Sequence, residues 1–312
     1  MLRLPDSWVW DCWFAHDGDR HHVFYLRASR GLGDPERRHR YPFVGHAVSD
    51  DLVSWEVLPD ALAVSDEPAW DDRTTWTGSV VRRDDGGWRM FYTGTTRADG
   101  GDMQRIGWAD SDDLVTWVKG PASSVLEADA RFYEKLDRDA WFDEAWRDPW
   151  VFRADDGRWH MYVTARSGDG DALGRGVVGH CVSDDLDGWD ILPPLTSPDQ
   201  GFGQTEVTQV EVVDGVPTLV FCCLAPQMSA DAVVRHGDGG MFSVTGPSVL
   251  GPFDLRDARR FPHPSLYAAR LVQHAGVWHL VGFRGDEDGV FVGELVDPIP
   301  VTSRPALGLV PR

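Results

Sequence analysis

The sequence predicts an all-β fold, a five-bladed β-propeller with four-stranded antiparallel blades around a central channel. A segment that contains Ser-Asp-Asp-Leu and then a tryptophan occurs three times, at residues 44–59, 106–121 and 178–193. An Asp/Gly turn and an alternating strand precede each copy, and two weaker relatives of this strand follow. These strands span residues 21–29, 87–95, 157–166, 215–223 and 276–284. Five units of roughly 60 residues, each built of short strands and turns, indicate a propeller.

The repeats fill the chain, so we predict one domain over residues 1–312 without a C-terminal β-sandwich. The blades are expected at about 8–62, 74–126, 146–198, 203–258 and 263–312. Residues 126–146, between the second and third blades, have helical and aromatic character, and we expect a helical insertion that caps the pocket. The residues after Asp297 are expected to supply or close a final strand.

Composition and charge exclude several classes of function. The chain is 42% hydrophobic and contains 15 Trp, many at repeated positions where we expect packing between blades. A formal net charge of −20 argues against nucleic acid or an anionic membrane as partner. The opening residues lack the apolar run of a signal peptide and no 18-residue apolar stretch occurs, so we expect a cytoplasmic protein. The sequence carries no signal of its oligomeric state.

The four cysteines show neither disulfide nor zinc spacing. They are Cys12, Cys181, Cys222 and Cys223. We expect free thiols, and we predict neither a metal nor a cofactor.

The third blade opens with the unusual stretch WRDPWVF, residues 146–152. Pro149 cannot donate a hydrogen bond to a sheet, and Asp148 is costly to bury. A local violation of this kind often marks a functional site.

Counting back from the glycine of each inner hairpin places acids at equivalent positions in three blades. Asp148 lies nine residues before Gly157, and Glu206 lies nine before Gly215. Asp11 lies seven before Gly18, and a difference of two keeps a strand residue on the same face. The same count leads from Gly87 to Gly78 in the second blade. We therefore predict that three carboxylates from blades one, three and four converge at the mouth of the channel.

Three acids around one pocket suit the cleavage of a glycosidic bond. A glutamate beside two ionised aspartates retains its proton more readily, so Glu206 is assigned as the general acid/base. Asp11 is assigned as the nucleophile and Asp148 as a stabiliser of the transition state. Arg147 is expected to hold Asp148 or a substrate hydroxyl.

Other residues have a structural and a functional interpretation. The aspartates of the repeated Ser-Asp-Asp-Leu segments are interpreted as turn residues. Glu211 is a rival to Glu206 on the same strand. Trp13, Trp76 and Trp146 are either platforms for sugar rings or packing between blades. His236 is either a polar loop residue or, because its loop is placed facing the site, a residue that binds substrate.

The site residues resemble the motifs of a known group of enzymes. WRDPW is similar to the Arg-Asp-Pro motif of glycoside hydrolase families 32 and 68, five-bladed propellers that act on β-fructofuranosides. VWDCW around Asp11 resembles the Trp-Asp-Ser-Trp segment of family 68 more than the Asn-Asp-Pro-Asn segment of family 32. WTGS at 76–79 is similar to their Trp-Ser-Gly-Ser segment, which makes Ser79 a candidate substrate-binding residue. TEV at 205–207 falls where these families place the acid/base, but the expected Cys-Pro or Arg-Pro does not follow.

The resemblance implies a retaining hydrolase, with or without fructosyl transfer, that acts on sucrose or short fructo-oligosaccharides. One alternative is an inverting enzyme similar to the arabinofuranosidases and xylosidases of family 43. Another is a sugar-binding propeller without catalysis.

Overall fold

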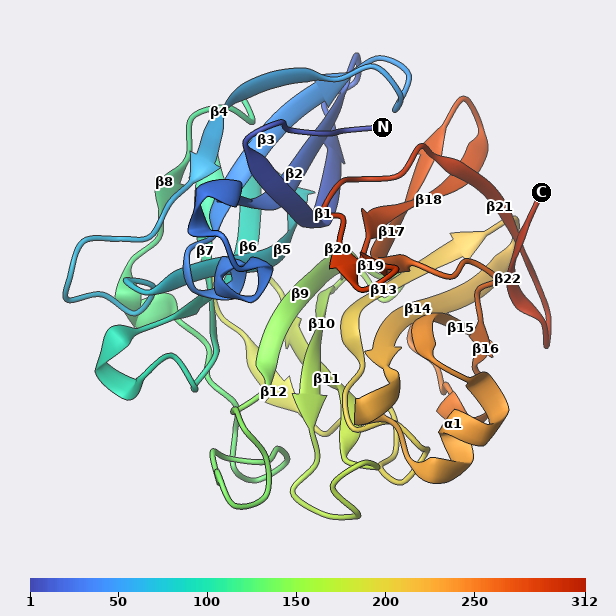
Figure 1. The fold of residues 1–312 in the computed structure, drawn as a ribbon. Helices are drawn as coiled ribbons and strands as arrows, with labels where there is room; N and C mark the ends of the chain where they lie inside the picture. The colour runs from blue at the N-terminus through green and yellow to red at the C-terminus, as the bar shows by residue number, and fades with distance from the viewer.

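Each predicted unit folds into one four-stranded antiparallel sheet in the computed structural model, which describes residues 1–312. The five sheets are arranged around a common centre, with the first strand of each nearest to it (Figure 1). The prediction of a five-bladed propeller is therefore confirmed. No helix is long and apolar enough to cross a membrane.

The strands follow the chain blade by blade. Blade one contains β1 (Ser7–His16), β2 (His21–Ser29), β3 (Phe43–Ser49) and β4 (Glu56–Leu62). Blade two contains β5 (Thr74–Arg82), β6 (Trp88–Thr95), β7 (Arg105–Ser111) and β8 (Val118–Lys119). Blade three contains β9 (Trp146–Arg153), β10 (Trp159–Arg166), β11 (Gly176–Ser183) and β12 (Asp190–Leu192). Blade four contains β13 (Glu206–Val213), β14 (Val216–Leu224), β15 (Gly239–Thr245) and β16 (Arg259–Arg260).

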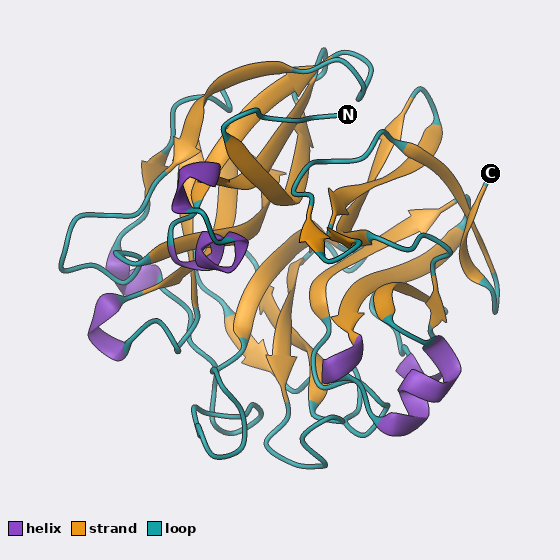
Figure 2. Cartoon of the chain, in the orientation of Figure 1, coloured by secondary structure: helices purple, strands orange, loops and turns teal.

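Blade five is completed by the C-terminal residues. It contains β17 (Leu266–His274), β18 (Val277–Arg284), β21 (Ile299–Arg304) and β22 (Gly308–Pro311), while β19 (Asp286–Glu287) and β20 (Val290–Phe291) pair separately. The residues after Asp297 thus supply the two outer strands. Helices are confined to the connections between strands (Figure 2). They are α1 (Ala230–His236) and the short 3-10 helices η1 (Arg30–Leu32), η2 (Pro35–Arg40), η3 (Arg97–Asp99), η4 (Ala122–Ser124), η5 (Ala225–Gln227) and η6 (Leu255–Asp257).

The repeated Ser-Asp-Asp-Leu segments form identical turns. In the first, the side chain of Asp51 accepts the backbone N–H groups of Val53 at 2.8 Å and Ser54 at 2.7 Å. The leucine of each copy has a left-handed backbone, with φ between 62° and 70°. The second aspartate of each turn has a lowered pKa, because the backbone N–H groups of the turn stabilise its charge. These acids are structural, as predicted.

The repeated tryptophans pack one blade against the one before it. Trp117 of blade two lies edge-on to Phe24 of blade one, with ring centroids 5.5 Å apart. Trp189 of blade three meets Phe91 of blade two in the same way, also at 5.5 Å. Aromatic contacts of this kind bury large apolar areas, which explains the high tryptophan content.

The prediction of a helical insertion at residues 126–146 is wrong, because these residues form turns and extended chain without a helix. Local hydrogen bonds and ion pairs replace the helix. Glu134 pairs with Arg166 and Arg175, each at 2.5 Å, and Lys135 pairs with Glu144. Aspartate side chains that accept nearby backbone N–H groups favour such turns over helix.

The ring is closed by contacts between the N-terminal residues and the connection that follows β18. The N–H of Leu295 donates to the carbonyl of Leu2 at 3.0 Å, and the N–H of Val9 donates to Gly293 at 2.9 Å. The guanidinium of Arg30 donates to the carbonyl of Val292 at 2.9 Å. Blades one and five are therefore joined by main-chain contacts as well as by packing.

Candidate active site

The innermost strand of every blade carries an extra residue at the same place. The pairing with the second strand shifts within 9–12 in β1, 76–78 in β5, 147–150 in β9, 206–209 in β13 and 267–270 in β17. In three blades the shift includes a residue with a left-handed backbone: Asp148 (φ 59°), Val207 (φ 53°) and Ala268 (φ 45°). A β-bulge redirects the side chains around it, and here the bulges surround the central opening.

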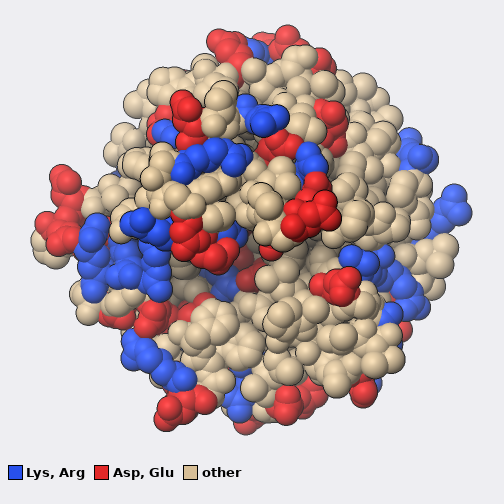
Figure 3. All heavy atoms as spheres, viewed as in Figure 1, with Lys and Arg blue, Asp and Glu red and all other residues tan.

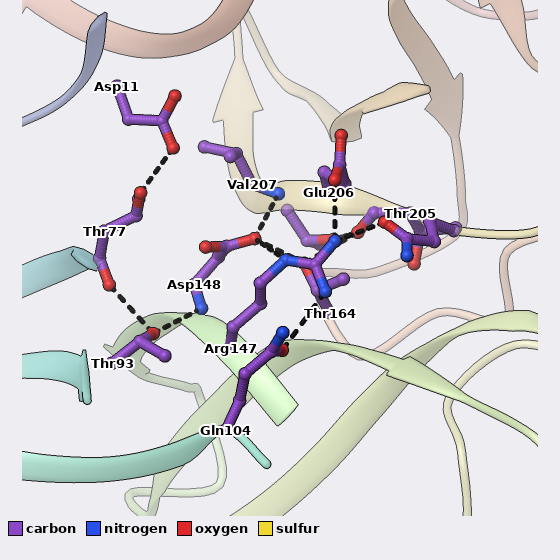
Figure 4. Close-up of polar contacts among 12 residues, drawn as sticks. Asp11, Thr77, Thr93, Gln104, Arg147, Asp148, Thr164, Thr205, Glu206 and Val207 are labelled. Atoms are coloured by element: carbon purple, nitrogen blue, oxygen red, sulfur yellow. Dashed lines mark hydrogen bonds and ion pairs between the residues drawn. The ribbon is translucent and has the colours of Figure 1, made fainter. Parts of the chain in front are cut away.

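The three predicted acids lie at these bulges and are brought together. Asp11 of β1 accepts a short hydrogen bond from the hydroxyl of Thr77 in β5. Asp148 of β9 accepts the hydroxyl of Thr164 at 2.8 Å and the N–H of Val207 at 3.2 Å. Glu206 immediately precedes Val207, so the carboxylates of blades one, three and four surround one space (Figure 4).

A relay of hydrogen bonds connects the blades that carry these acids. The hydroxyl of Thr93 donates to the carbonyl of Thr77 at 3.1 Å and accepts the N–H of Asp148 at 2.9 Å. Asp11 and Asp148 are thus linked through two threonines of blade two. The molecular surface is hollowed near the centre of the face in Figure 3, where acidic and basic side chains lie together.

Arg147 forms the cationic part of the site. Its Nη2 donates to Oε1 of Glu206 at 2.6 Å and to the side-chain oxygen of Gln204. Its Nη1 donates to Gln104 at 3.1 Å, whereas its Nε lies 3.5 Å from Asp148. The arginine was expected to hold Asp148, but its shorter contact is with Glu206.

Burial and mutual repulsion raise the pKa values of two acids. The pKa of Asp11 is raised to about 7, chiefly by burial and then by the charge of Asp148, while the Thr77 hydroxyl opposes the shift. Burial also raises the pKa of Asp148, although Arg147 opposes this. Asp11 and Asp148 therefore keep their protons to a higher pH than an aspartate exposed to water does.

Tyr267 and Thr77 are site residues that the sequence did not reveal. The hydroxyl of Tyr267, in β17, donates a short hydrogen bond to Oε2 of Glu206. Burial, followed by the charge of Glu206, raises the pKa of this phenol well above its usual value. In blade two the hairpin glycine with positive φ is Gly86, not Gly87. Counting nine residues back from Gly86 would have indicated Thr77 instead of Gly78.

Three of the predicted substrate-binding residues are structural. Trp13 and Trp146 are both 0% exposed, and they pack on Phe24 and Tyr133 at ring-centroid distances of 6.3 and 4.8 Å. A sugar cannot reach either ring. Ser79 is buried and accepts the N–H of Val151 at 3.1 Å, so its hydroxyl joins blades two and three.

The contacts of His236 are with aromatic rings. It ends α1 and packs against Phe202 and Phe242, with ring-centroid distances of 6.1 and 5.2 Å. These contacts belong to the packing of blade four, and substrate binding by His236 stays a prediction.

Trp76 is the one predicted aromatic platform whose ring stays partly accessible. It precedes Thr77, and its indole N–H donates to the carbonyl of His39 at 3.1 Å. Arg147 contributes to lowering the pKa of His39, after burial and Arg38, so this face of η2 lies beside the site.

The rival acid Glu211 lies further along β13. Burial raises its pKa to about 7, and its side chain accepts a hydrogen bond from Gln209 at 3.3 Å. It contacts none of the three acids. The four cysteines are all free and buried, and no three His, Cys, Asp or Glu residues are arranged to hold a metal ion.

Known proteins resemble the chain in fold along its whole length. An inulosucrase from Halalkalicoccus jeotgali, solved with kestose, has a TM-score of 0.77 at 20% identity, over 98% of this chain and 89% of that one. A family 32 β-fructofuranosidase from Bombyx mori has a TM-score of 0.73 at 20% identity, over 97% of this chain and 62% of that one.

Sequence relatives match over shorter segments. β-Fructofuranosidase 1 of Zea mays is 44% identical over 85 residues, which is 26% of this chain and 12% of that protein. The sucrose-6-phosphate hydrolase of Escherichia coli is 34% identical over 173 residues, which is 53% of this chain and 31% of that protein. The matches thus span less than a third of these curated relatives. Residues 13–239 match the N-terminal domain of glycosyl hydrolases family 32, and the chain therefore belongs to that family.

Proposed function

We propose that the protein is a retaining glycoside hydrolase that cleaves β-fructofuranosidic bonds in sucrose or short fructo-oligosaccharides. The observation that carries this proposal is the meeting of Asp11, Asp148 and Glu206, which come from three blades, around one opening. Membership of family 32 supports the same chemistry.

Each carboxylate is assigned one role in this mechanism. Asp11 is the nucleophile, and its short contact with Thr77 orients the carboxyl group while leaving one oxygen free to attack. Glu206 donates a proton to the leaving oxygen and later activates water. Asp148, held by Thr164 and Val207, stabilises positive charge that develops on the sugar ring.

Names of similar proteins support the substrate class. The curated relatives include β-fructofuranosidases, fructosyltransferases and sucrose-6-phosphate hydrolases. A covalent fructosyl intermediate could be released to water or to a second sugar, so transfer is a natural accompaniment of hydrolysis.

Sugar release from sucrose, kestose and an aryl β-fructofuranoside tests the proposal. We expect fructose release by the wild-type protein and losses of at least several hundredfold in kcat for Asp11→Asn and for Glu206→Gln, on the order expected for covalent and acid catalysis. Glu211→Gln, on the same strand as Glu206, is the matched control and should keep wild-type turnover. Turnover near that of the wild type in either of the first two variants would refute the role of that residue.

Stereochemistry separates the proposal from an inverting family-43-like mechanism. When methanol is present as acceptor, a retaining enzyme produces methyl β-fructofuranoside, whereas inversion gives the α-anomer. Proton NMR of the first product distinguishes them. Binding of fructosides without any turnover would instead favour a sugar-binding propeller.

A further inference from the structure

Blade five supplies no acid to the site, yet its innermost strand places a fully buried arginine at the centre of the ring. Arg270 of β17 is 1% exposed. Its Nη1 donates to the carbonyls of Thr208 at 2.6 Å and Val207 at 3.2 Å, and its Nη2 donates to that of Gly78 at 3.4 Å. The guanidinium lies 5.2 Å from the ring centroid of Trp150. One side chain of blade five thus contacts the innermost strands of blades two, three and four.

This cation forms no ion pair, and its Nε has no hydrogen-bond partner. An isolated buried charge is strongly unfavourable, so charges nearby must compensate for it. The ionisable groups that face it are Asp148 of β9, Asp11 and Cys12 of β1, and Cys222 of β14. Strands β5 and β13 contribute carbonyl oxygens. The two aspartates are the groups that can supply the compensating negative charge, because burial raises the pKa values of both thiols well above neutral pH.

We propose that Arg270 is a positioning residue, whose fixed positive charge favours the ionised forms of Asp11 and Asp148 and whose hydrogen bonds hold the β13 bulge beside Glu206. The reacting sugar would lie on the solvent side of the carboxylates, with Arg270 on the buried side. The residue does not touch the substrate.

The geometry of the β13 bulge supports the second part of this role. Val207 is β-branched and has a φ of 53°, a conformation that such residues rarely adopt. Arg270 donates to its carbonyl and to the next one, while the N–H of Val207 donates to Asp148. Loss of the guanidinium would free the peptide groups that place both Glu206 and the donor to Asp148.

Electrostatics supports the first part. The groups that face Asp11 are Asp148, Glu206, Thr77 and Arg270, and among them Arg270 supplies the positive charge that lowers its pKa. Burial and the two acids act in the opposite direction. The family match covers residues 13–239 and does not include Arg270. The role proposed for Arg270 therefore rests on its contacts in this structure.

NMR titration of the protein labelled with carboxyl-¹³C aspartate tests the charge directly. The resonance of Asp11 is assigned by its absence in Asp11→Asn. In Arg270→Gln we expect the pKa of Asp11 to rise by at least about half a unit, since a positive charge has been removed. Arg89→Gln is the matched control, because Arg89 is also buried but pairs with Asp110 and Asp187. It should lower Tm and leave the Asp11 titration unchanged.

Arg270→Lys separates charge from hydrogen bonding and also covers the case in which the Gln variant does not fold. We expect Lys to keep the Asp11 titration within about 0.3 units and to lower kcat at least tenfold, because an ammonium group cannot replace the forked donor. An unshifted Asp11 titration in folded Arg270→Gln would overturn the proposal, as would a Lys variant with wild-type kcat. The NMR result needs no turnover, so it stands even if fructosides are not the substrate.

Discussion

The raised pKa of Asp11 has a consequence for stability that can be measured without substrate. Its folded pKa of about 7 lies above the ordinary value of 3.8, so the folded protein binds this proton more tightly than the unfolded chain. The contribution of Asp11 is favourable below pH 4 and is lost as pH rises through about 7. We therefore expect Asp11→Asn to exceed the wild type in free energy of unfolding by on the order of 1–3 kcal/mol at pH 8.

Urea unfolding at pH 4 and pH 8 measures this difference. The gain should disappear at pH 4, and Asp112→Asn, at an exposed position of a repeated turn, should show no gain at either pH. An Asn variant that is less stable than the wild type at pH 8 would contradict the prediction.

Tyr267 is expected to matter for turnover more than for binding. Tyr267→Phe removes the donor to Oε2 of Glu206 and leaves the acid held by Arg147 alone. A carboxyl group that is free to move is a poorer proton donor, so kcat should fall about 10- to 100-fold with a smaller change in KM. Steady-state kinetics on an aryl fructoside measure both constants.

Tyr162→Phe is the control for this change, because its buried hydroxyl donates to the carbonyl of Val249 at 2.7 Å, away from the site. It should lower Tm and preserve kcat. Equal kcat values in the two Phe variants would argue against the role of Tyr267.

At the scale of residues, the sequence revealed the acids but not their surroundings. Asp148 was visible because it breaks the pattern of its strand, whereas Glu206 and Asp11 were found by counting back from the hairpin glycines. Tyr267, a partner of Glu206, was not found, since it resembles any aromatic strand residue. Trp13 and Trp146 each lie two residues from an acid, so strict alternation would place them on the same face as that acid. The bulges at 9–12 and 147–150 break the alternation, and both rings are buried in the packing.

At the scale of elements, Glu134 is one of two buried glutamates that hold the insertion at residues 126–146. Glu134 pairs with both Arg166 and Arg175, and Arg166 is almost fully buried. Glu134→Ala leaves these cations without their partner, so we expect a loss of about 3–5 kcal/mol in unfolding free energy. The insertion also carries Asp143, which lies 3.5 Å from Arg147, so KM should rise as well.

Thermal unfolding and steady-state kinetics check both effects. Glu127→Ala is a suitable control, because Glu127 pairs with Arg105 and is half exposed. A stable Glu134→Ala variant with an unchanged KM would show that the insertion is held mainly by its other contacts.

Counting back from the hairpin glycines led to three acids that lie around one opening, although the assumption of strict alternation behind it does not hold. Alternation alone was used to place Asp11, Asp148 and Glu206 on one face, yet a bulge interrupts each innermost strand. Asp148 lies within the bulge of β9, whereas Glu206 lies just before that of β13. The bulges occur in all five blades, so the count remained comparable between blades even though strict alternation failed.

At the scale of the whole molecule, the repeats made the number of blades predictable, because each copy specifies one sheet and its packing on the previous sheet. Ring closure is different. It joins Leu2, Val9 and Arg30 to residues 292–295, which lie in the connection after β18 and outside the recurring strands. A contact made once, between distant parts of the chain, leaves no periodic signal.

The closure should control the stability of the entire ring. Leu2 is 3% exposed and belongs to the main hydrophobic cluster, and its carbonyl accepts the N–H of Leu295. Leu2→Ala should lower the unfolding free energy by about 2 kcal/mol or more, as at other buried leucines. The exposed Leu307→Ala should have little effect.

Chemical labelling of the buried thiols shows whether the loss of stability in Leu2→Ala affects all blades equally. Cys12, Cys181 and Cys222 lie in blades one, three and four, and each becomes reactive only when its blade opens. Because every blade packs on two neighbours, we expect Leu2→Ala to lower the urea concentration at which all three thiols are labelled, and by the same amount. Labelling of Cys12 at lower urea than Cys181 would instead mean that blade one opens alone and that closure stabilises only the blades it joins.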